Sequence, residues 1–598
     1  MTILMECRRW LLNKTNPEFI QYLAKTASVS PVFAQVLVNR GLKSAAAISD
    51  FLNPGLTQLS DPLDIDGVYA AARRIREAAD GNERIFIHGD YDADGVCATA
   101  IVYRALKARG ADCLYFIPER FGHGYGFHPH GVQKAKEAGA SLIITVDCGI
   151  TSFEAVAAAK KEGIDVVITD HHEPARSAKR RAQSAKGGHA DTDRGAEAST
   201  LQPFDHPTGE VQLPDAYAVI NPKITCQGTS FEHLSGAGVA LKLMHAVYGE
   251  ALSDLMLLLD LAAIGTVADV VPLTGENRVI VRGGLPLIND GCRPGIKALM
   301  RVAGIDGREV KAGRLAYSVI PRINAAGRLA ASGDVVRLLT TDSEDEAWQI
   351  ALWLDRLNTE RQRIEEGIFQ EALQKLGSKD TSSAIVLSGE GWHEGVIGIV
   401  ASRIAEKYSR PAVIFSVGDG IAKGSARSIA SFDICRALSD CSDLLISYGG
   451  HKQAAGVKLK ASQLGGFGKM LRAIFDAAGD IRPATEITID AEVSLSEMSF
   501  GLVRELNMLE PLGLGNPEPL FGARKLDVLS PRIVGAKHVR MKLCQRSCRV
   551  DTIGFDMGRI IDKLDIDGAI DAVITPSLNE WNGGRYLQLI LRAFRPAV

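Results

Sequence analysis

Three aspartates and one histidine lie within seven residues in the segment His88-Gly-Asp-Tyr-Asp-Ala-Asp-Gly95. An EF-hand calcium loop is the main alternative, since the three aspartates match its first ligand positions. That loop needs a bidentate Glu at its twelfth position, where this chain has Ile101. A turn or capping role is also open, but clustered carboxylates repel one another unless a cation lies between them. The segment therefore predicts a metal site.

More acids and histidines follow other predicted strands. Asp147 and the triplet Asp170-His-His172 each come directly after an apolar, β-rich run. Asp147 alone would fit a helix cap, but the same pattern at three strand ends favours a shared site. Asp269 lies within an apolar stretch, where an unpaired carboxylate would be costly. We therefore expect these groups to share the predicted metal site.

The residue types in this set indicate the chemistry. Carboxylates and imidazoles without thiolates suit Mn²⁺ or Mg²⁺ better than structural zinc. Six or more ligands are too many for one ion, so the pattern indicates two divalent cations. Two cations about 3.5–4 Å apart are the usual arrangement for phosphoester hydrolysis. The sequence therefore predicts hydrolysis at phosphorus.

An alternation of strands and helices must position these residues. Apolar β-rich runs at 84–88, 113–117, 142–146 and 166–169 are separated by amphipathic stretches. This alternation predicts an α/β domain with a doubly wound parallel sheet, in which ligands bind beyond the carboxyl ends of the strands. The acids and histidines stand at those ends.

The rest of the chain divides by composition and periodicity. We expect an N-terminal helical support, the catalytic α/β domain, a connecting helix, a smaller α/β domain and a C-terminal β-barrel of the oligonucleotide-binding (OB) type. Their predicted ranges are 1–65, 66–340, 341–378, 379–482 and 483–598. Residues 174–214 are rich in Ser, Ala, Gly and mixed charge, and we expect a disordered insertion there.

Composition limits the function classes. A chain of 598 residues with 46% hydrophobic residues and a net charge of −3 is neither one small module nor a globally basic nucleic-acid binder. The scattered cysteines indicate a reducing compartment. Since no targeting or membrane-spanning segment is evident, we expect a soluble, cytoplasmic protein without a membrane partner. The sequence contains no phosphate-binding P-loop motif, so we do not expect an ATP-driven motor.

The motifs in this order resemble the DHH phosphoesterase superfamily. The resemblance rests on His88–Gly95, Asp147, Asp170–His172 and Asp269, together with the glycine-rich Gly449–Gly456, which is similar to a motif of the DHH-associated (DHHA1) domain. The segments 321–328 and 393–403 and the strand-rich tail are similar to single-stranded-DNA exonucleases within this superfamily. The resemblance thus identifies the two α/β domains as DHH and DHHA1 domains.

The resemblance also implies roles for individual residues. One ion would be held by His88 and Asp92, the other by Asp94, His171 and Asp269, and Asp147 would bridge them. Asp90 and Asp170 would support these ligands, and His172 would act near the scissile phosphate as a hydrogen-bond or proton donor. The implied substrate contacts are Arg120, Arg322, Asn324, Arg328, Ser425, Arg427 and His451.

The implied activity is 5′-to-3′ degradation of single-stranded DNA to 5′-mononucleotides in recombination and repair. Implied partners are a helicase of the RecQ type and single-stranded-DNA-binding protein, and we expect a monomer. A basic stretch at 524–549 would track the DNA backbone, although a solvated charged face is its alternative. Two other functions stay open: a relative that hydrolyses short substrates such as dinucleotides or pyrophosphate, and a catalytically silent binding scaffold.

Overall fold

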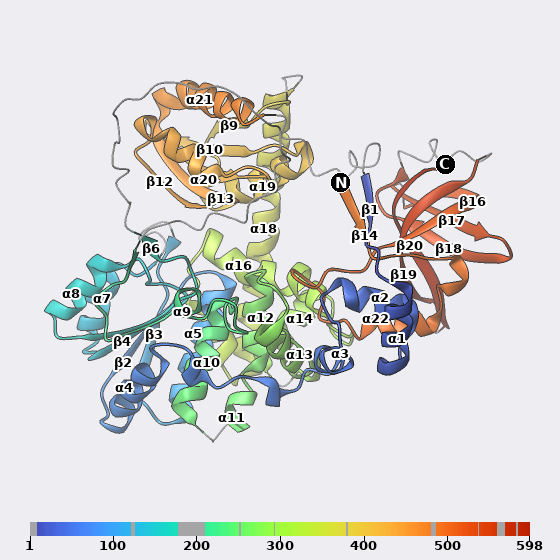
Figure 1. The fold of residues 1–598 in the computed structure, drawn as a ribbon. Coiled ribbons are helices and arrows are strands. Elements are labelled where there is room, and N and C mark those ends of the chain that lie inside the picture. The colour runs from blue at the N-terminus through green and yellow to red at the C-terminus, as the bar shows by residue number, and fades with distance from the viewer. Residues whose placement is uncertain are drawn as a thin grey trace, which may run out of the picture.

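The computed structural model describes residues 9–120, 126–176, 210–249, 253–291, 293–377, 381–479, 486–535, 537–558, 568–581 and 584–597. Three bodies are visible in Figure 1: an α/β and helical body, a smaller α/β body above it, and a barrel beside it. Most of the predicted insertion, residues 177–209, lies outside the described residues. Its two ends, Ala175–Arg176 (β6) and Val211–Gln212 (β7), pair as antiparallel strands rather than being disordered.

The first body contains the predicted parallel sheet. Its strand order is β3-β2-β4-β5-β8, and every pair is parallel. The strands are β2 (Ile85–His88), β3 (Cys113–Phe116), β4 (Leu142–Val146), β5 (Asp165–Thr169) and β8 (Ala218–Ile220). Both faces are buried, because alternate strand residues enter two separate cores. One core includes α4 (Val68–Asp80), α5 (Ala93–Ala108) and α10 (Gly236–Tyr248), and the other α7 (Pro129–Glu137) and α8 (Phe153–Lys161).

Helices extend this body and connect it to the next. They include α9 (Pro222–Thr225), α11 (Ser253–Met256), α12 (Leu259–Ala268), α13 (Gly275–Asp290), α14 (Pro294–Val302), α15 (Ala312–Arg314), α16 (Ile320–Leu329) and α17 (Gly333–Thr340). The long helix α18 (Glu344–Leu376) then rises into the upper body (Figure 1). It begins at the N-cap Ser343, whose side chain accepts the Glu346 N–H, with three acids in its first turn. None of the described helices is both long and apolar enough to cross a membrane.

The upper body is a mixed sheet covered by helices. Its strand order is β12-β13-β11-β10-β9, in which only the β9–β10 pair is parallel. The strands are β9 (Ile385–Glu390), β10 (Ala412–Gly418), β11 (Ile421–Arg427), β12 (Ser447–His451) and β13 (Ala454–Lys460), and the helices are α19 (Glu394–Tyr408), α20 (Ile434–Asp440) and α21 (Leu464–Ala477).

The third body is a closed five-stranded barrel. Its strands follow the order β16-β17-β18-β20-β19, and pairing of β16 with β19 closes it. They are β16 (Phe521–Val534), β17 (His538–Gln545), β18 (Cys548–Gly554), β19 (Ile570–Trp581) and β20 (Gly584–Pro596), preceded by β15 (Ala491–Glu492) and α22 (Phe500–Asn507). This architecture is that of the predicted OB fold.

The N-terminal segment differs from the helical support that we expected. Besides α1 (Pro17–Ala27), α2 (Pro31–Asn39) and α3 (Ala45–Leu52), it contains a strand, β1 (Arg9–Leu12), which pairs in parallel with β14 (Glu486–Ile489). The helices share one hydrophobic core with the barrel, and Figure 1 shows them against it. Helical periodicity cannot reveal this, because the partner strand lies far away in the chain.

Candidate metal centre

The carboxyl ends of β2, β4 and β5 bring most of the predicted ligands together. These strands are neighbours in the sheet, so the loops that follow them meet at one edge. Asp90, Asp94, Asp147, Asp170 and His171 are all buried there, while Asp92 is exposed. Asp269 joins them from the C-terminal end of α12.

The loop after β2 turns sharply into α5. Asp92 is the N-cap, and its Oδ1 accepts the N–H groups of Asp94 and Gly95 at 3.0 Å each. A Cβ on Gly95 would lie 2.7 Å from Cβ of Asp90 and 2.8 Å from its carbonyl oxygen, so the turn needs glycine there. The segment that carries these acids is thus a strand-to-helix turn. It is not an EF-hand loop, as the missing Glu at the twelfth position predicted.

The helices behind the sheet come unusually close to the acids. The carboxylate of Asp94 accepts the N–H groups of Gly236 at 2.6 Å and Ala237 at 2.9 Å, at the start of α10. A Cβ on Gly236 would lie 2.5 Å from Oδ1 of Asp147, and one on Gly265 would lie 2.6 Å from Oδ1 of Asp94. These glycines could not be recognised from the sequence, because no local pattern links them to acids so far away in the chain.

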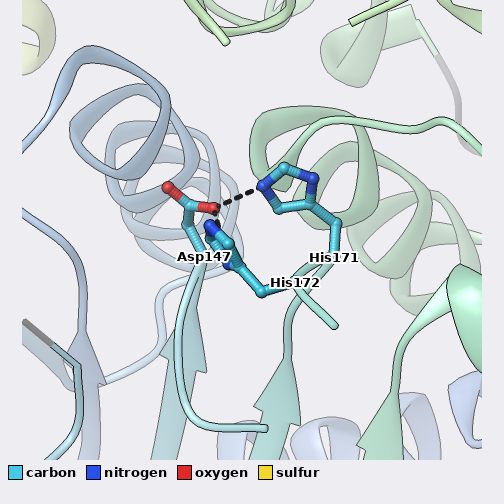
Figure 2. Close-up of side chains that lie close together, drawn as sticks. All are labelled: Asp147, His171 and His172. Carbon is cyan, nitrogen blue, oxygen red and sulfur yellow. Dashed lines mark ion pairs between the residues drawn. The ribbon is translucent and has the colours of Figure 1, made fainter. Parts of the chain in front are cut away.

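His171 lies among three carboxylates. Its Nε2 is 3.0 Å from Oδ1 of Asp147 and 3.8 Å from Oδ2 of Asp94, and its Nδ1 is 3.5 Å from Oδ2 of Asp269. The neighbouring ring of His172 faces the same Asp147 oxygen (Figure 2), with its Nδ1 4.0 Å away. Asp147 itself has the left-handed backbone angle φ = 61°, which turns the chain sharply after β4.

Asp170 is occupied by hydrogen bonds. Its carboxylate accepts the N–H groups of Ile150 at 2.9 Å, His171 at 2.7 Å and His172 at 3.0 Å, and Nδ1 of His172 lies 2.7 Å away. Burial alone would raise the pKa of Asp170, but the interactions with His172 and the backbone lower it overall. The same pair raises the pKa of His172 despite its burial. These hydrogen bonds of Asp170 therefore fix the orientation of His171 and His172.

The remaining acids are arranged to attract cations. Burial, followed by repulsion from neighbouring aspartates, raises the pKa of Asp94 to about 7 and that of Asp269 to about 9. It raises the pKa values of Asp90 and Asp147 well above normal for the same reasons. Oδ1 of Asp90 is buried and accepts no hydrogen bond from the described residues. Such carboxylates need positive charge to stay ionised, so the donor set fits divalent cations.

Three groups have ligand atoms within 4.8 Å of one another: Asp94 with His171 and Asp269, Asp90 with Asp92 and Asp147, and Asp147 with His171 and His172. Asp147 occurs in two groups, as expected of a bridging ligand. His88 belongs to none of these groups of described residues. Its buried ring instead packs against Phe127, with Nδ1 3.8 Å from Sγ of Cys148. Its predicted role as a ligand stays a prediction.

A cavity of about 1730 Å³ opens over this centre, between the first and the upper body. Asp92, Asp170, His172 and Asp269 line it on one side, and Ser425, Arg427 and His451 on the other. The start of α8, including Phe153, also lines the cavity, which the sequence analysis did not identify. Phe153 is 38% exposed at the start of a helix, and nothing in the neighbouring sequence indicates that it lines a cavity.

The predicted cationic contacts divide into two sets. Arg120 lines the cavity above the ring of Tyr91, with its guanidinium 5.3 Å from the ring centroid, and Arg328 donates to the Gly395 carbonyl at 2.9 Å. Burial, and then repulsion from Arg120 and other arginines, lowers the pKa of Arg328 to about 10. By contrast, Arg322 is paired with Asp355 at 2.8 Å, and Asn324 accepts the Ala93 N–H at 2.9 Å. Arg322 and Asn324 hold helices together and, like Arg328, are not among the described residues that line the cavity.

Comparison with known proteins agrees with this architecture. The sequence models of the DHH family N-terminal domain, the DHHA1 domain and the RecJ OB domain match residues 84–186, 380–477 and 489–593. The single-stranded-DNA-specific exonuclease RecJ of Bacillus subtilis is 35% identical over 592 residues, which cover 98% of this chain and 70% of that protein. RecJ of Escherichia coli K12 is 34% identical, with 94% of this chain and 96% of that protein covered.

A solved structure is similar throughout. RecJ from Thermus thermophilus in complex with Mn²⁺ matches 98% of this chain and 79% of its own, with a TM-score of 0.81 and 31% identity. The same protein has also been solved with Mg²⁺, and matches with a TM-score of 0.75 and 30% identity, over 98% of this chain and 78% of its own. These are the two cations that the residue types indicated. By domain content, sequence and fold, this chain belongs to the RecJ family, whose catalytic domain is of the DHH type.

Proposed function

We propose that this protein is a metal-dependent, single-stranded-DNA-specific exonuclease acting in DNA recombination and repair, which degrades its substrate from the 5′ end and releases 5′-mononucleotides. The observation that carries the proposal is a cavity with opposite charges on its two sides: aspartates and His172 of the first body on one side, and Lys423 and Arg427 of the upper body on the other, with Arg120 also in the lining. Such a cavity suits a phosphodiester held between cations and guanidinium groups.

Two Mn²⁺ or Mg²⁺ ions would be held by the grouped residues. Asp94, His171 and Asp269 would hold one ion, Asp90 and Asp92 the other, with Asp147 between them. This differs from the division that the resemblance implied, in which His88 rather than Asp90 was a ligand. When bound, the ions would supply positive charge that activates water and stabilises the negative charge that develops on the phosphate oxygens.

His172 is placed to serve the scissile phosphate. The Asp170 carboxylate fixes Nδ1 of its ring at 2.7 Å and raises the pKa of the imidazole, while its side chain lines the cavity. A ring held through one nitrogen can offer the other to a phosphate or leaving oxygen. Loss of this donor would slow the chemical step without removing a metal ligand.

The arginine side would hold the end of the DNA. Arg427 donates to Oγ of Ser425 at 3.0 Å, and Gly398, which has no side chain, leaves room beside both. Arg120 and Arg427 line the cavity and make no ion pair with the acids of the described residues, so their charges are available to an anion. A 5′-terminal phosphate fits this chemistry and would make cleavage exonucleolytic.

Family membership alone supports the remaining parts of the proposal. These are a cytoplasmic location, a monomeric state, and cooperation with a RecQ-type helicase and single-stranded-DNA-binding protein.

The barrel would hold the DNA beyond the cavity. Its exposed Arg532 lies directly opposite Arg540 in the β16–β17 ladder, and since Arg540 already lies 3.9 Å from Asp551, Arg532 is the cation of this pair that a DNA phosphate would contact.

The test is hydrolysis of 3′-labelled single-stranded DNA in Mn²⁺, alongside its duplex, an RNA copy and a dinucleotide. We expect progressively shorter labelled products from single-stranded DNA alone. Cleavage of only the dinucleotide would instead identify a short-substrate phosphoesterase, and binding without cleavage a scaffold. Arg427→Met should remove any preference for a 5′-phosphate over a 5′-hydroxyl. Arg436→Met, an exposed arginine of the same domain, is the matched control.

A further inference from the structure

Asp269 is the one grouped acid that does not follow a strand of the parallel sheet. It is the C-cap of α12, and the next residue, Val270, has φ = 58° and is 66% exposed. A β-branched residue rarely adopts this left-handed conformation, because its side chain crowds the backbone. Surrounding structure must therefore hold the backbone beside Asp269 in place.

The segment that follows Asp269 contacts the barrel side of the molecule. The N–H of Leu273 donates to the carbonyl of Leu514 at 2.7 Å. Gly515 has φ = 75°, and a Cβ there would lie 3.1 Å from Cβ of Pro272. We call residues 509–517, which connect α22 to the barrel, the barrel loop. Its glycines allow two backbones to pack directly against each other.

The barrel loop is itself held firmly. The fully buried Asn516 donates to the carbonyls of Leu509 at 2.7 Å and Pro511 at 2.9 Å, and its Oδ1 accepts Nε of Arg40 at 2.8 Å. Both N–H donors of this amide and its oxygen are thus hydrogen-bonded. The loop is a rigid turn and not a flexible connection.

A buried arginine fastens the loop to the catalytic body. Arg278, on α13, is 2% exposed and donates Nη1 to the Leu509 carbonyl at 2.8 Å and Nε to the Phe51 carbonyl at 2.9 Å. Its guanidinium also lies 3.9 Å from the centroid of the Phe51 ring. This one side chain joins the catalytic body, the N-terminal helices and the barrel loop.

We propose that the barrel loop positions Asp269, by holding residues 270–273 in the strained course that aims this carboxylate at His171. The OB domain then contributes to the metal centre as well as to DNA binding. This inference rests on the proposed two-cation site and adds a positioning element to it. Partners that support metal ligands typically change metal affinity about 10- to 100-fold when they are altered.

The test compares Gly515→Val with Gly307→Val in the full-length chain. Gly307 is a matched control, since it is an exposed glycine with φ = 71° and has no part in the contact with residues 270–273, the cavity or the basic stretch of the barrel. We expect Gly515→Val to bind one of two Mn²⁺ ions about tenfold more weakly by calorimetric titration. Amide exchange across 270–274 should be faster, while single-stranded-DNA affinity and the thermal midpoint match those of the control.

Equal Mn²⁺ affinities in the two variants would overturn the inference. Should Gly515→Val fail to fold, Arg278→Met removes the bonds to the loop without adding bulk, and the same selective loss is expected. The inference can also be separated from the proposed function. If the unaltered protein binds Mn²⁺ but cleaves no DNA, while Gly515→Val loses Mn²⁺ affinity, the proposed function fails and the positioning role stands.

Discussion

Replacing Asp170 by asparagine keeps the shape of the side chain and removes its charge. The amide of asparagine has one acceptor, whereas the carboxylate now receives Ile150 N–H on one oxygen and the N–H groups of His171 and His172 on the other. One of these sites must therefore face an NH₂ group, leaving a buried donor unsatisfied at about 1–3 kcal/mol. Both histidines lose their fixed orientation, so we expect kcat/KM to fall about 10- to 100-fold.

Asp165→Asn is the matched control. Asp165 lies at the opposite end of the same strand, where it accepts Nε of Arg74 at 2.7 Å, far from the cavity. Turnover of 3′-labelled DNA and Mn²⁺ affinity should be close to normal in Asp165→Asn and reduced in Asp170→Asn, with DNA binding retained in both. The reasoning is refuted if Asp170→Asn and Asp165→Asn agree within about twofold in both quantities.

Three further predictions follow from the same centre. Asp147→Asn suits the left-handed backbone but lacks the charge, so turnover should be abolished while DNA binding persists; near-normal turnover would exclude a bridging role. Because burial raises the pKa of Asp94 to about 7 and that of Asp269 to about 9, Asp269 is protonated and Asp94 about half protonated in the metal-free protein at neutral pH. Mn²⁺ must displace these protons, so its affinity should rise from pH 6 to 9, with proton release that calorimetry in buffers of different ionisation enthalpy detects. No dependence on pH or buffer would contradict this. Replacing Arg532 and Lys542 of the barrel by Ala should lower the salt slope of single-stranded-DNA binding by about 0.7 per residue, and an unchanged slope would place the DNA elsewhere.

The parallel sheet could be predicted because each strand is buried on both faces and reads as an apolar run. The four strands predicted for it agree with β2 to β5 within about a residue at each end. The short strand β8 was not predicted, since a three-residue strand has no periodicity of its own. Strand β1 was not predicted for a different reason: it is a strand because it pairs with β14, which lies far away in the chain.

The candidate site was predictable where chemistry is concentrated along the chain. Acids clustered at strand ends reveal themselves by type and spacing, as Asp90, Asp92 and Asp94 do. Contacts made by backbone groups, or made possible by a glycine, cannot be predicted in this way. Nothing in the sequence near Gly236 indicates that its N–H donates to a carboxylate 142 positions earlier. Likewise, the motif that contains Arg322 cannot show that this guanidinium faces Asp355 and not the cavity.

The charges on the two sides of the cavity make its ligands depend on one another. Without cations, the carboxylates below would repel an incoming phosphate or take up protons, because burial has raised their pKa values. Burial lowers the pKa of Arg328, which interacts with Arg120 and Arg427, only to about 10, so this guanidinium stays charged at neutral pH. A bound anion would relieve the repulsion among these arginines. Bound cations would neutralise the carboxylates, and a bound phosphodiester would neutralise the cationic side chains. Either ligand alone would leave the charge of one side uncompensated. Asp170, Asp269 and Arg120 belong to the first body and Arg427 to the upper body, so a phosphodiester bound in the cavity would contact both of the domains that α18 joins.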